Sequence, residues 1–145
     1  MRVLIADDSK IIRSRITKIL SEYKQIDSID EANNVQEAIE LIHKSYPNVL
    51  ILDVKMPDGN GMEVLNAIEH DQPQSPPPVV IVITNYPFPE YEKEYMTAGA
   101  DFFFDKSSEF KLMKKVIENL VDNEIRIKAF GKEPKQSGEE GKNYN

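Results

Sequence analysis

The chain has 145 residues, a formal net charge of −7 at pH 7 and no cysteine, which fits one domain and excludes disulfides, zinc–thiolate sites and thiol nucleophiles. The acidic balance argues against a direct nucleic-acid surface, because such contacts need clustered Lys and Arg. No apolar run is long enough for a signal peptide or a membrane span, so we expect a cytoplasmic protein without a membrane partner.

The first part of the chain predicts two strands with a helix between them. Residues 3–6 form a short apolar run typical of a buried strand, and a helix capped by Asp8 or Ser9 follows it to about Tyr23. Residues 25–32 carry few large apolar side chains, which indicates a weak strand at the edge of a sheet. Basic residues lie off the apolar stripe of the helix, where they form either a solvated face or a docking surface.

The next segment predicts the strand that organises the sheet. A helix capped by Asn33 or Asn34 precedes it. Residues 49–52 form an unbroken apolar run that ends in Asp53, a pattern typical of a strand buried on both faces of a parallel sheet. A Pro-Asp-Gly turn then leads into a third amphipathic helix near Met62.

The second half continues the same alternation. The proline-rich segment 71–78 is interpreted as a stiff connector, with a docking peptide as the alternative. Residues 79–83 predict a central strand, 90–98 a helix and 102–104 a fifth strand.

The chain ends in a long helix and a polar segment. The helix is capped by Ser107 or Ser108 and continues to about Phe130. The segment that follows is rich in Gly, Glu, Lys and Ser and poor in apolar residues, which is typical of disorder. We therefore expect one domain over residues 1–130 and a flexible C-terminal tail over residues 131–145.

Five strand–helix alternations predict an α/β fold, with a five-stranded parallel sheet covered by helices on both faces. The carboxyl ends of parallel strands share one edge, where ligands collect. Polar residues follow four of these ends: Asp7 and Asp8, Asp53, Thr84, and Asp105 with Lys106. We expect these groups to converge on one pocket, although Asp53 taken alone also fits the start of a solvated loop.

The predicted set of side chains suits phosphoryl transfer onto a carboxylate. Clustered carboxylates repel one another, and a hard divalent cation such as Mg2+ relieves that repulsion while leaving room for phosphate oxygens. A Lys and a Thr supply a point charge and a hydrogen bond to those oxygens. Acyl transfer is not supported, because no nucleophile–His pair is present, and no glycine-rich loop follows the first strand for a dinucleotide.

The chain resembles the receiver domain of two-component response regulators, of the single-domain CheY-like type, over about residues 2–120. The resemblance rests on five site positions and one turn: Asp7-Asp8, Asp53, Met56-Pro57-Asp58-Gly59, Thr84 and Lys106. It implies a flavodoxin-like, doubly wound sheet with strand order 2-1-3-4-5. It also implies a phosphorylation-dependent signalling switch rather than an enzyme.

The resemblance assigns a role to each site position. Asp53 is the phosphoacceptor, supplied by a histidine kinase or a histidine phosphotransfer protein, and Thr84 and Lys106 bind the phosphoryl oxygens. The implied ligands of Mg2+ (or Mn2+) are Asp8, Asp53 and the backbone carbonyl of Lys55, with Asp7 helping through water.

The resemblance also implies how a signal leaves the site. Thr84 moves toward the phosphoryl group, and Phe103 swings into the space behind it; the alternative is a Phe that stays buried in the core. The output surface is the helix near Tyr91, the strand of Phe103 and the last helix. It would act on an unknown downstream protein or in a phosphorylation-dependent homodimer.

Two departures from the family pattern affect expectations. Ser107 replaces the proline that usually follows the Lys, so we expect a trans bond and a reshaped loop, because a cis bond without proline costs about 3–4 kcal/mol. Lys55 and Tyr86 are large residues at positions that flank the path of the attacking water. We predict that they slow hydrolysis of the acyl phosphate; the alternative is that both are ordinary surface residues.

Three other readings use the same residues. A receiver cut from a longer regulator fits as well as a stand-alone receiver, which we take as the leading interpretation. A phosphatase of the haloacid dehalogenase type would place Asp-x-Asp after the first strand, whereas Asp7 and Asp8 are adjacent. A scaffold that is never phosphorylated is disfavoured by the complete site.

Overall fold

The computed structural model describes residues 1–71 and 76–130, without the side chains of 69–71 and 124–130. The predicted tail at 131–145 and part of the proline-rich connector lie outside the described residues. No helix in the described part has the length and apolar character needed to cross a bilayer.

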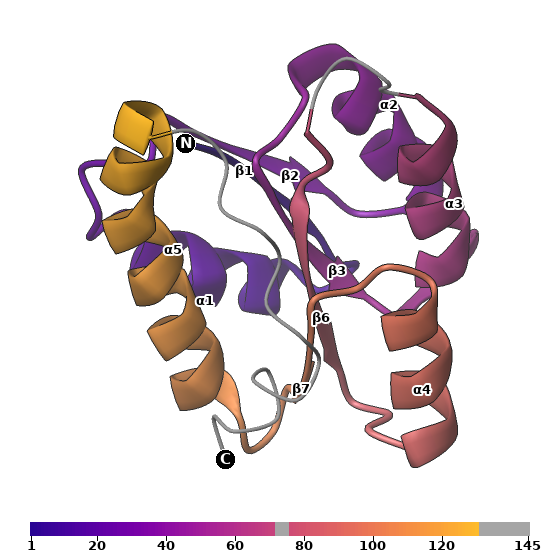
Figure 1. The fold of residues 1–145 in the computed structure, drawn as a ribbon. Helices are drawn as coiled ribbons and strands as arrows, with labels where there is room; N and C mark the ends of the chain where they lie inside the picture. The colour runs from indigo at the N-terminus through magenta and orange to yellow at the C-terminus, as the bar shows by residue number, and fades with distance from the viewer. Residues whose placement is uncertain (72–75, 131–145) are drawn as a thin grey trace.

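Five parallel strands form one sheet with the order β2-β1-β3-β6-β7 (Figure 1). The strands are β1 Arg2–Ala6, β2 Ser28–Ala32, β3 Val49–Asp53, β6 Val79–Thr84 and β7 Phe102–Asp105. Counted along the chain, this is the predicted order 2-1-3-4-5, and the weak strand β2 lies at the edge as expected. The α/β, doubly wound fold is therefore confirmed.

Helices cover both faces of the sheet (Figure 1). They are α1 Lys10–Leu20, α2 Val35–Ser45, α3 Gly61–Asp71, α4 Pro89–Thr97 and α5 Phe110–Phe130. One apolar cluster joins the sheet to α1 and α5, and a second joins it to α2, α3 and α4.

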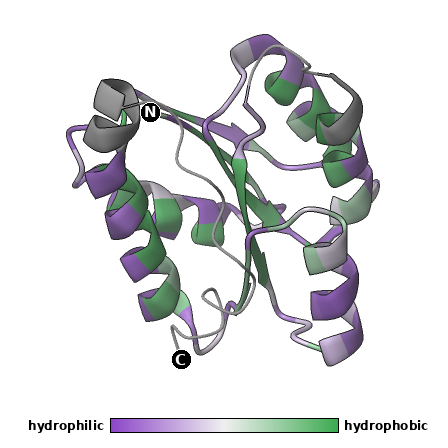
Figure 2. Cartoon of the chain, in the orientation of Figure 1, coloured by the Kyte–Doolittle hydropathy of each residue, from purple (hydrophilic) through white to green (hydrophobic). Residues whose placement is uncertain are grey.

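The alternation of side chains along the strands explains the two clusters. Leu50 and Leu52 of β3 face one cluster, whereas Val49 and Ile51 face the other, because successive side chains of a strand point to opposite faces. The central strands β3 and β6 are therefore apolar at every position before their last residue, and they run as an apolar band between amphipathic helices in Figure 2. This burial holds the strand ends in register with one another.

Local hydrogen bonds decide between the alternative helix caps. The Ser9 hydroxyl accepts a bond from the Ile12 amide (3.3 Å), and the Asn34 side chain accepts one from the Glu37 amide (2.8 Å). These residues, rather than Asp8 and Asn33, cap α1 and α2.

Two predicted helix boundaries are wrong, each for a local reason. Helix α1 stops at Leu20 rather than near Tyr23, because the Tyr23 amide bonds back to the Leu20 carbonyl in a tighter turn (3.1 Å). Helix α5 begins at Phe110 rather than after Ser107 or Ser108. Both serine hydroxyls instead donate to the Asp105 carboxylate, at 2.7 and 3.1 Å. The Lys106–Ser107 peptide bond is trans, as expected.

A short hairpin that the sequence did not predict follows β3. Strands β4 Lys55–Met56 and β5 Gly59–Asn60 pair antiparallel around the Pro-Asp turn. The next residue, Gly61, begins α3 at a point of close approach. A Cβ atom placed there would lie 2.7 Å from the Asp53 carbonyl oxygen and 3.0 Å from Tyr95 Cε2.

We expect Gly61→Ala to lower the free energy of unfolding by about 2 kcal/mol, because the added methyl group meets backbone and a buried ring. Urea denaturation at constant Mg2+ measures the change. Gly59→Ala is the matched control, since its Cβ would meet only the flexible Glu63 side chain. Equal stability of the two variants would contradict the close approach at Gly61.

Candidate functional site

The carboxyl ends of four strands bring together polar side chains from distant parts of the sequence. Asp7 follows β1, Asp53 ends β3, Thr84 ends β6 and Lys106 follows β7. The pairing of β3 with β6 and of β6 with β7 sets these ends side by side, with Asp53 opposite Ile83 and Thr84 opposite Asp105. Packing of the sheet, rather than any local contact, therefore assembles the site.

Lys106 is the only cation at the centre of this cluster among the described residues. Its Nζ atom lies 2.6 Å from Asp7 Oδ2 and 3.0 Å from Asp53 Oδ2. All three side chains are buried, with Asp7 0%, Asp53 5% and Lys106 6% exposed. Two buried carboxylates thus share one ammonium, and the centre carries a net negative charge.

The pKa of Asp53 reflects this imbalance. The pKa is raised from 3.8 to about 6, first by burial and then by the nearby Asp7 carboxylate, and Lys106 only partly opposes these two effects. For Lys106, burial lowers the pKa, but hydrogen bonding and attraction to Asp7 and Asp53 outweigh it, so the pKa is raised overall. The lysine therefore stays charged, and it does not fully neutralise the acceptor carboxylate.

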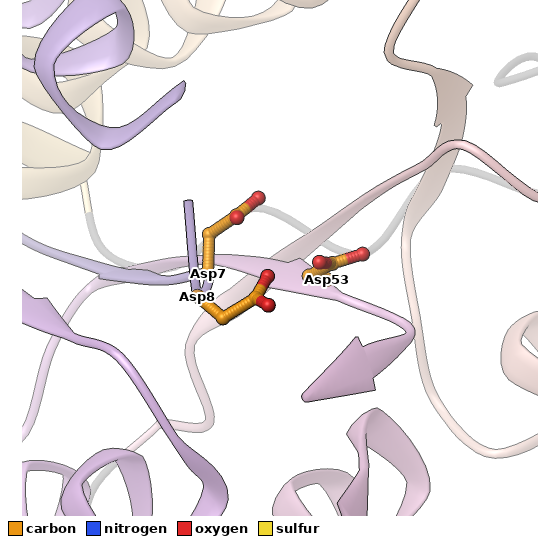
Figure 3. A group of neighbouring side chains, drawn as sticks. All are labelled: Asp7, Asp8 and Asp53. Carbon is orange, nitrogen blue, oxygen red and sulfur yellow. The ribbon is translucent and has the colours of Figure 1, made fainter. Parts of the chain in front are cut away.

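Three carboxylates at this edge suit a hard cation. Oxygen atoms of Asp7, Asp8 and Asp53 lie within 4.8 Å of one another, and Figure 3 shows the three side chains gathered beside the end of β3. Asp8 is exposed to water, and Asp7 Oδ2 is buried without a well-directed hydrogen bond, although Lys106 lies near it. Mixed burial, oxygen ligands and excess negative charge together fit Mg2+, which keeps some of its waters.

Thr84 is fully buried at the end of β6, with its backbone and side chain both engaged. Its carbonyl oxygen accepts a hydrogen bond from the Lys106 amide (2.9 Å), and its Oγ1 accepts one from the Tyr86 amide (2.9 Å). The first bond ties β6 to the lysine. Because the Tyr86 amide donates to the Thr84 hydroxyl, a shift of this hydroxyl also affects the loop that leads to α4.

Lys55 and Tyr86 contact each other above the site edge. Lys55 Nζ lies 4.2 Å from the centre of the Tyr86 ring, a cation–π arrangement. Both side chains are exposed; Lys55 begins the short strand β4 that follows β3, and Tyr86 lies in the loop that follows β6. The two residues that sequence analysis grouped by position are therefore also in direct contact.

Phe103 lies partly buried on β7 rather than deep in the core. Its ring packs at a tilt against Tyr95 of α4, with ring centres 6.3 Å apart. The sequence gave no sign that Tyr95 would meet Phe103 or lie near the loop that follows Asp53.

Sequence analysis named Asp58 and Asp105 but did not predict that their carboxylates hold the loops of the site. Asp58, in the turn of the β4–β5 hairpin, accepts hydrogen bonds from the amides of Val35 (2.7 Å) and Gln36 (3.1 Å) at the start of α2. These bonds lower the pKa of Asp58, and the bond from the Val35 amide has the largest effect. The sequence shows that Asp58 lies in the turn after Asp53, but the Val35 amide that donates to it lies 23 residues earlier in the chain.

Asp105 plays a similar part in the loop before α5. Its carboxylate accepts hydrogen bonds from the Ser107 side chain (2.7 Å), the Ser107 amide (2.9 Å) and the Ser108 side chain (3.1 Å). The Ser107 side chain is the main reason that the pKa of Asp105 is lowered. This network shapes the loop beside Lys106 where the family pattern has a proline.

A family model for the response regulator receiver domain matches residues 3–118. Curated relatives include the response regulator GacA of Pseudomonas aeruginosa, which is 28% identical over 83% of this chain and 55% of its own length. A protein-glutamate methylesterase/protein-glutamine glutaminase of Geobacillus kaustophilus is 43% identical over 57% of this chain and 23% of its own. The chain thus spans less than two thirds of these relatives.

Solved structures show the same likeness. The signal receiver domain of a DNA-binding response regulator from Colwellia psychrerythraea has a TM-score of 0.75 and 27% identity, covering 84% of this chain and 98% of that one. The response regulator domain of Thermotoga maritima CheB has a TM-score of 0.71 and 25% identity, covering 85% and 94%.

The raised pKa of Asp53 predicts a specific pH dependence without divalent cations. A carboxyl group whose pKa is raised by folding stabilises the protein below its ordinary pKa of 3.8 and loses that contribution as the pH rises through about 6. The free energy of unfolding of Asp53→Asn should therefore be about 1–3 kcal/mol higher than that of the parent at pH 7.5 in EDTA. The gain should shrink toward pH 4.

Urea denaturation at several pH values measures this difference. Glu90→Gln, a neutralised carboxylate on the exposed start of α4, should differ from the parent by less than about 0.5 kcal/mol throughout. A gain for Asp53→Asn that grows as the pH falls would contradict the assigned direction.

Proposed function

The chain belongs to the family of response regulator receiver domains, and we propose that it is a phosphorylation-dependent signalling switch with Asp53 as its phosphoacceptor. A histidine kinase or a histidine phosphotransfer protein would supply the phosphoryl group. The observation that carries this proposal is the buried Asp53 carboxylate held 3.0 Å from the Lys106 ammonium, beside Asp7 and Asp8.

The transfer exchanges one bond for another. A carboxylate oxygen of Asp53 forms a bond to phosphorus while the bond from phosphorus to the donor imidazole nitrogen breaks, and the electron pair returns to that nitrogen. Burial without full neutralisation suits Asp53 for this role, because the ionised carboxylate is poorly stabilised before the reaction. Lys106 then stabilises the phosphoryl oxygens, on which negative charge is spread during transfer.

Asp7, Asp8, Asp53 and the backbone carbonyl of Lys55 are the residues that would hold Mg2+. When bound, this ion would offset the charge shared by the carboxylates and the phosphoryl group. Asp7 also orients the lysine, since its Oδ2 lies 2.6 Å from Nζ and its Oδ1 accepts a bond from the Ser9 amide at 2.8 Å. Asp7 therefore links the lysine to the start of α1.

Phosphorylation then changes the partners of Thr84. The phosphoryl group adds about −1.5 to −2 charge and strong acceptor oxygens, which draw the hydroxyl away from its present contact. The Thr84 hydroxyl now accepts from the Tyr86 amide, so its movement releases the loop before α4. Phe103 would occupy the space left behind, and the surface of α4, β7 and α5 would act on a downstream protein or a second copy of the chain.

Incubation with acetyl phosphate and Mg2+ tests the acceptor. Intact mass should show one phosphoryl adduct on the parent and none on Asp53→Asn, which lacks the nucleophilic oxygen. Lys106→Met should react about 100-fold more slowly, because it loses the charge that stabilises the transferring group.

Asp8→Asn supplies the control for the metal, and its labelling should need more Mg2+ than that of the parent. Labelling of Asp53→Asn at the parental level, or at another residue of the parent, would contradict Asp53 as acceptor.

Lys55 and Tyr86 predict a slow loss of the phosphoryl group. We propose that the cation–π pair of Lys55 and Tyr86 shields the acyl phosphate from water, so Lys55→Ala and Tyr86→Ala should each hydrolyse it about two- to fivefold faster. Loss of the adduct after removal of acetyl phosphate, followed by intact mass, gives the rates. Lys93→Ala, an exposed lysine of α4, is the control, and unchanged rates in the first two variants would refute the shield.

A further inference from the structure

Tyr95 is the one fully buried residue of α4, with 2% of its surface exposed. Every other residue of this short helix reaches solvent at least in part. Its burial among the residues that pack against β3 and α3 makes it the main contact of α4 with the rest of the fold. Whatever moves Tyr95 therefore moves α4.

The Tyr95 hydroxyl reaches the backbone directly after the acceptor. It donates a long hydrogen bond to the Val54 carbonyl oxygen, at 3.5 Å. The ring lies against Gly61, where even a Cβ atom would come within 3.0 Å of Tyr95 Cε2. The tyrosine of α4 is thus fitted into the junction between the acceptor loop and α3.

Val54 connects this junction to the acceptor side chain. Its amide donates to Asp53 Oδ1 at 2.8 Å in a buried position. Its carbonyl oxygen accepts from Tyr95 and, at 2.9 Å, from the Gly61 amide. One residue therefore bonds to the acceptor carboxylate on one side and to Tyr95 on the other.

Tyr95 also contacts the aromatic residue of the proposed switch. Its ring packs against Phe103, with centres 6.3 Å apart and planes inclined by 54°. Phe103 has no hydroxyl group, so its side chain cannot form a hydrogen bond. Tyr95 does form such a bond, because its hydroxyl donates to the Val54 carbonyl oxygen directly after Asp53.

We propose that Tyr95 is a positioning residue that transmits phosphorylation of Asp53 to α4, through Val54 and in contact with Phe103. This inference rests on the function proposed above. Conversion of the carboxylate to an acyl phosphate weakens the charge on the oxygen that the Val54 amide now contacts. The backbone of Val54 then shifts, and the hydrogen bond from the Tyr95 hydroxyl to the Val54 carbonyl oxygen changes with it.

Tyr95→Phe removes the hydroxyl and keeps the ring. The variant should fold, because the Val54 carbonyl keeps its bond from the Gly61 amide. Tyr91→Phe is the matched control, since it removes the same atom from the same helix at a partly exposed position. Hydrogen–deuterium exchange of α4 is measured for each full-length protein before and after acetyl phosphate and Mg2+, at a degree of phosphorylation matched by intact mass.

In the parent and in Tyr91→Phe, phosphorylation should change exchange in α4 by about fivefold or more. In Tyr95→Phe that change should fall to less than half, with Asp53 still phosphorylated. A merely structural role would shift exchange equally in both forms and leave their ratio intact.

An unchanged ratio in Tyr95→Phe, or an equal loss in Tyr91→Phe, would overturn the role of Tyr95 while leaving Asp53 as acceptor. Absence of the phosphoryl adduct in the parent would instead overturn the proposed function, and this inference with it.

Discussion

The site depends on one buried ammonium placed between two buried carboxylates. Lys106 lies 2.6 Å from Asp7 and 3.0 Å from Asp53, and its charge compensates in part for the burial of the two carboxylates. Burial, with the neighbouring Asp7 carboxylate as the second cause, raises the pKa of Asp53 to about 6, and the pairing leaves one negative charge in excess. This excess negative charge is electrostatically unfavourable. A bound divalent cation, or a phosphoryl group held by the lysine, would change the charge balance of the site. In the proposed function, the same imbalance would favour metal binding, phosphorylation of Asp53 and the switch that follows.

This arrangement exists only because the sheet is rigid. The three residues come from the ends of β1, β3 and β7, so their mutual distances depend on the register of these strands. Apolar side chains on both faces of the central strands, packed against helices on each side, prevent a slip in register. At Gly61 the packing is close enough to exclude a single methyl group. Stability of the fold and geometry of the site thus have a common origin.

The loops around this rigid edge are held by their own carboxylates. Asp58 bonds the amides that begin α2, and Asp105 bonds Ser107 and Ser108 beside the lysine. The latter network takes the place of a proline, so loop shape here depends on hydrogen bonds that water and charge can change. By contrast, Tyr95 anchors α4 through packing and one long hydrogen bond. The output side of the site is therefore joined to the acceptor by weaker contacts than those that hold the acceptor itself.

The order of the sheet came from the resemblance to the receiver family, whereas the amino-acid sequence by itself determined the alternation of strands and helices and the residues at the strand ends. These follow from apolar periodicity and from the rule that parallel strands share one edge, both of which act over short stretches of chain. Only the tertiary structure decided where α1 ends and where α5 begins, that Asp58 accepts hydrogen bonds from the amides at the start of α2 about 23 residues earlier, and that Tyr95 reaches Val54. Such contacts join residues remote in sequence, and the side chains involved carry no local pattern that distinguishes them from ordinary turn or core residues.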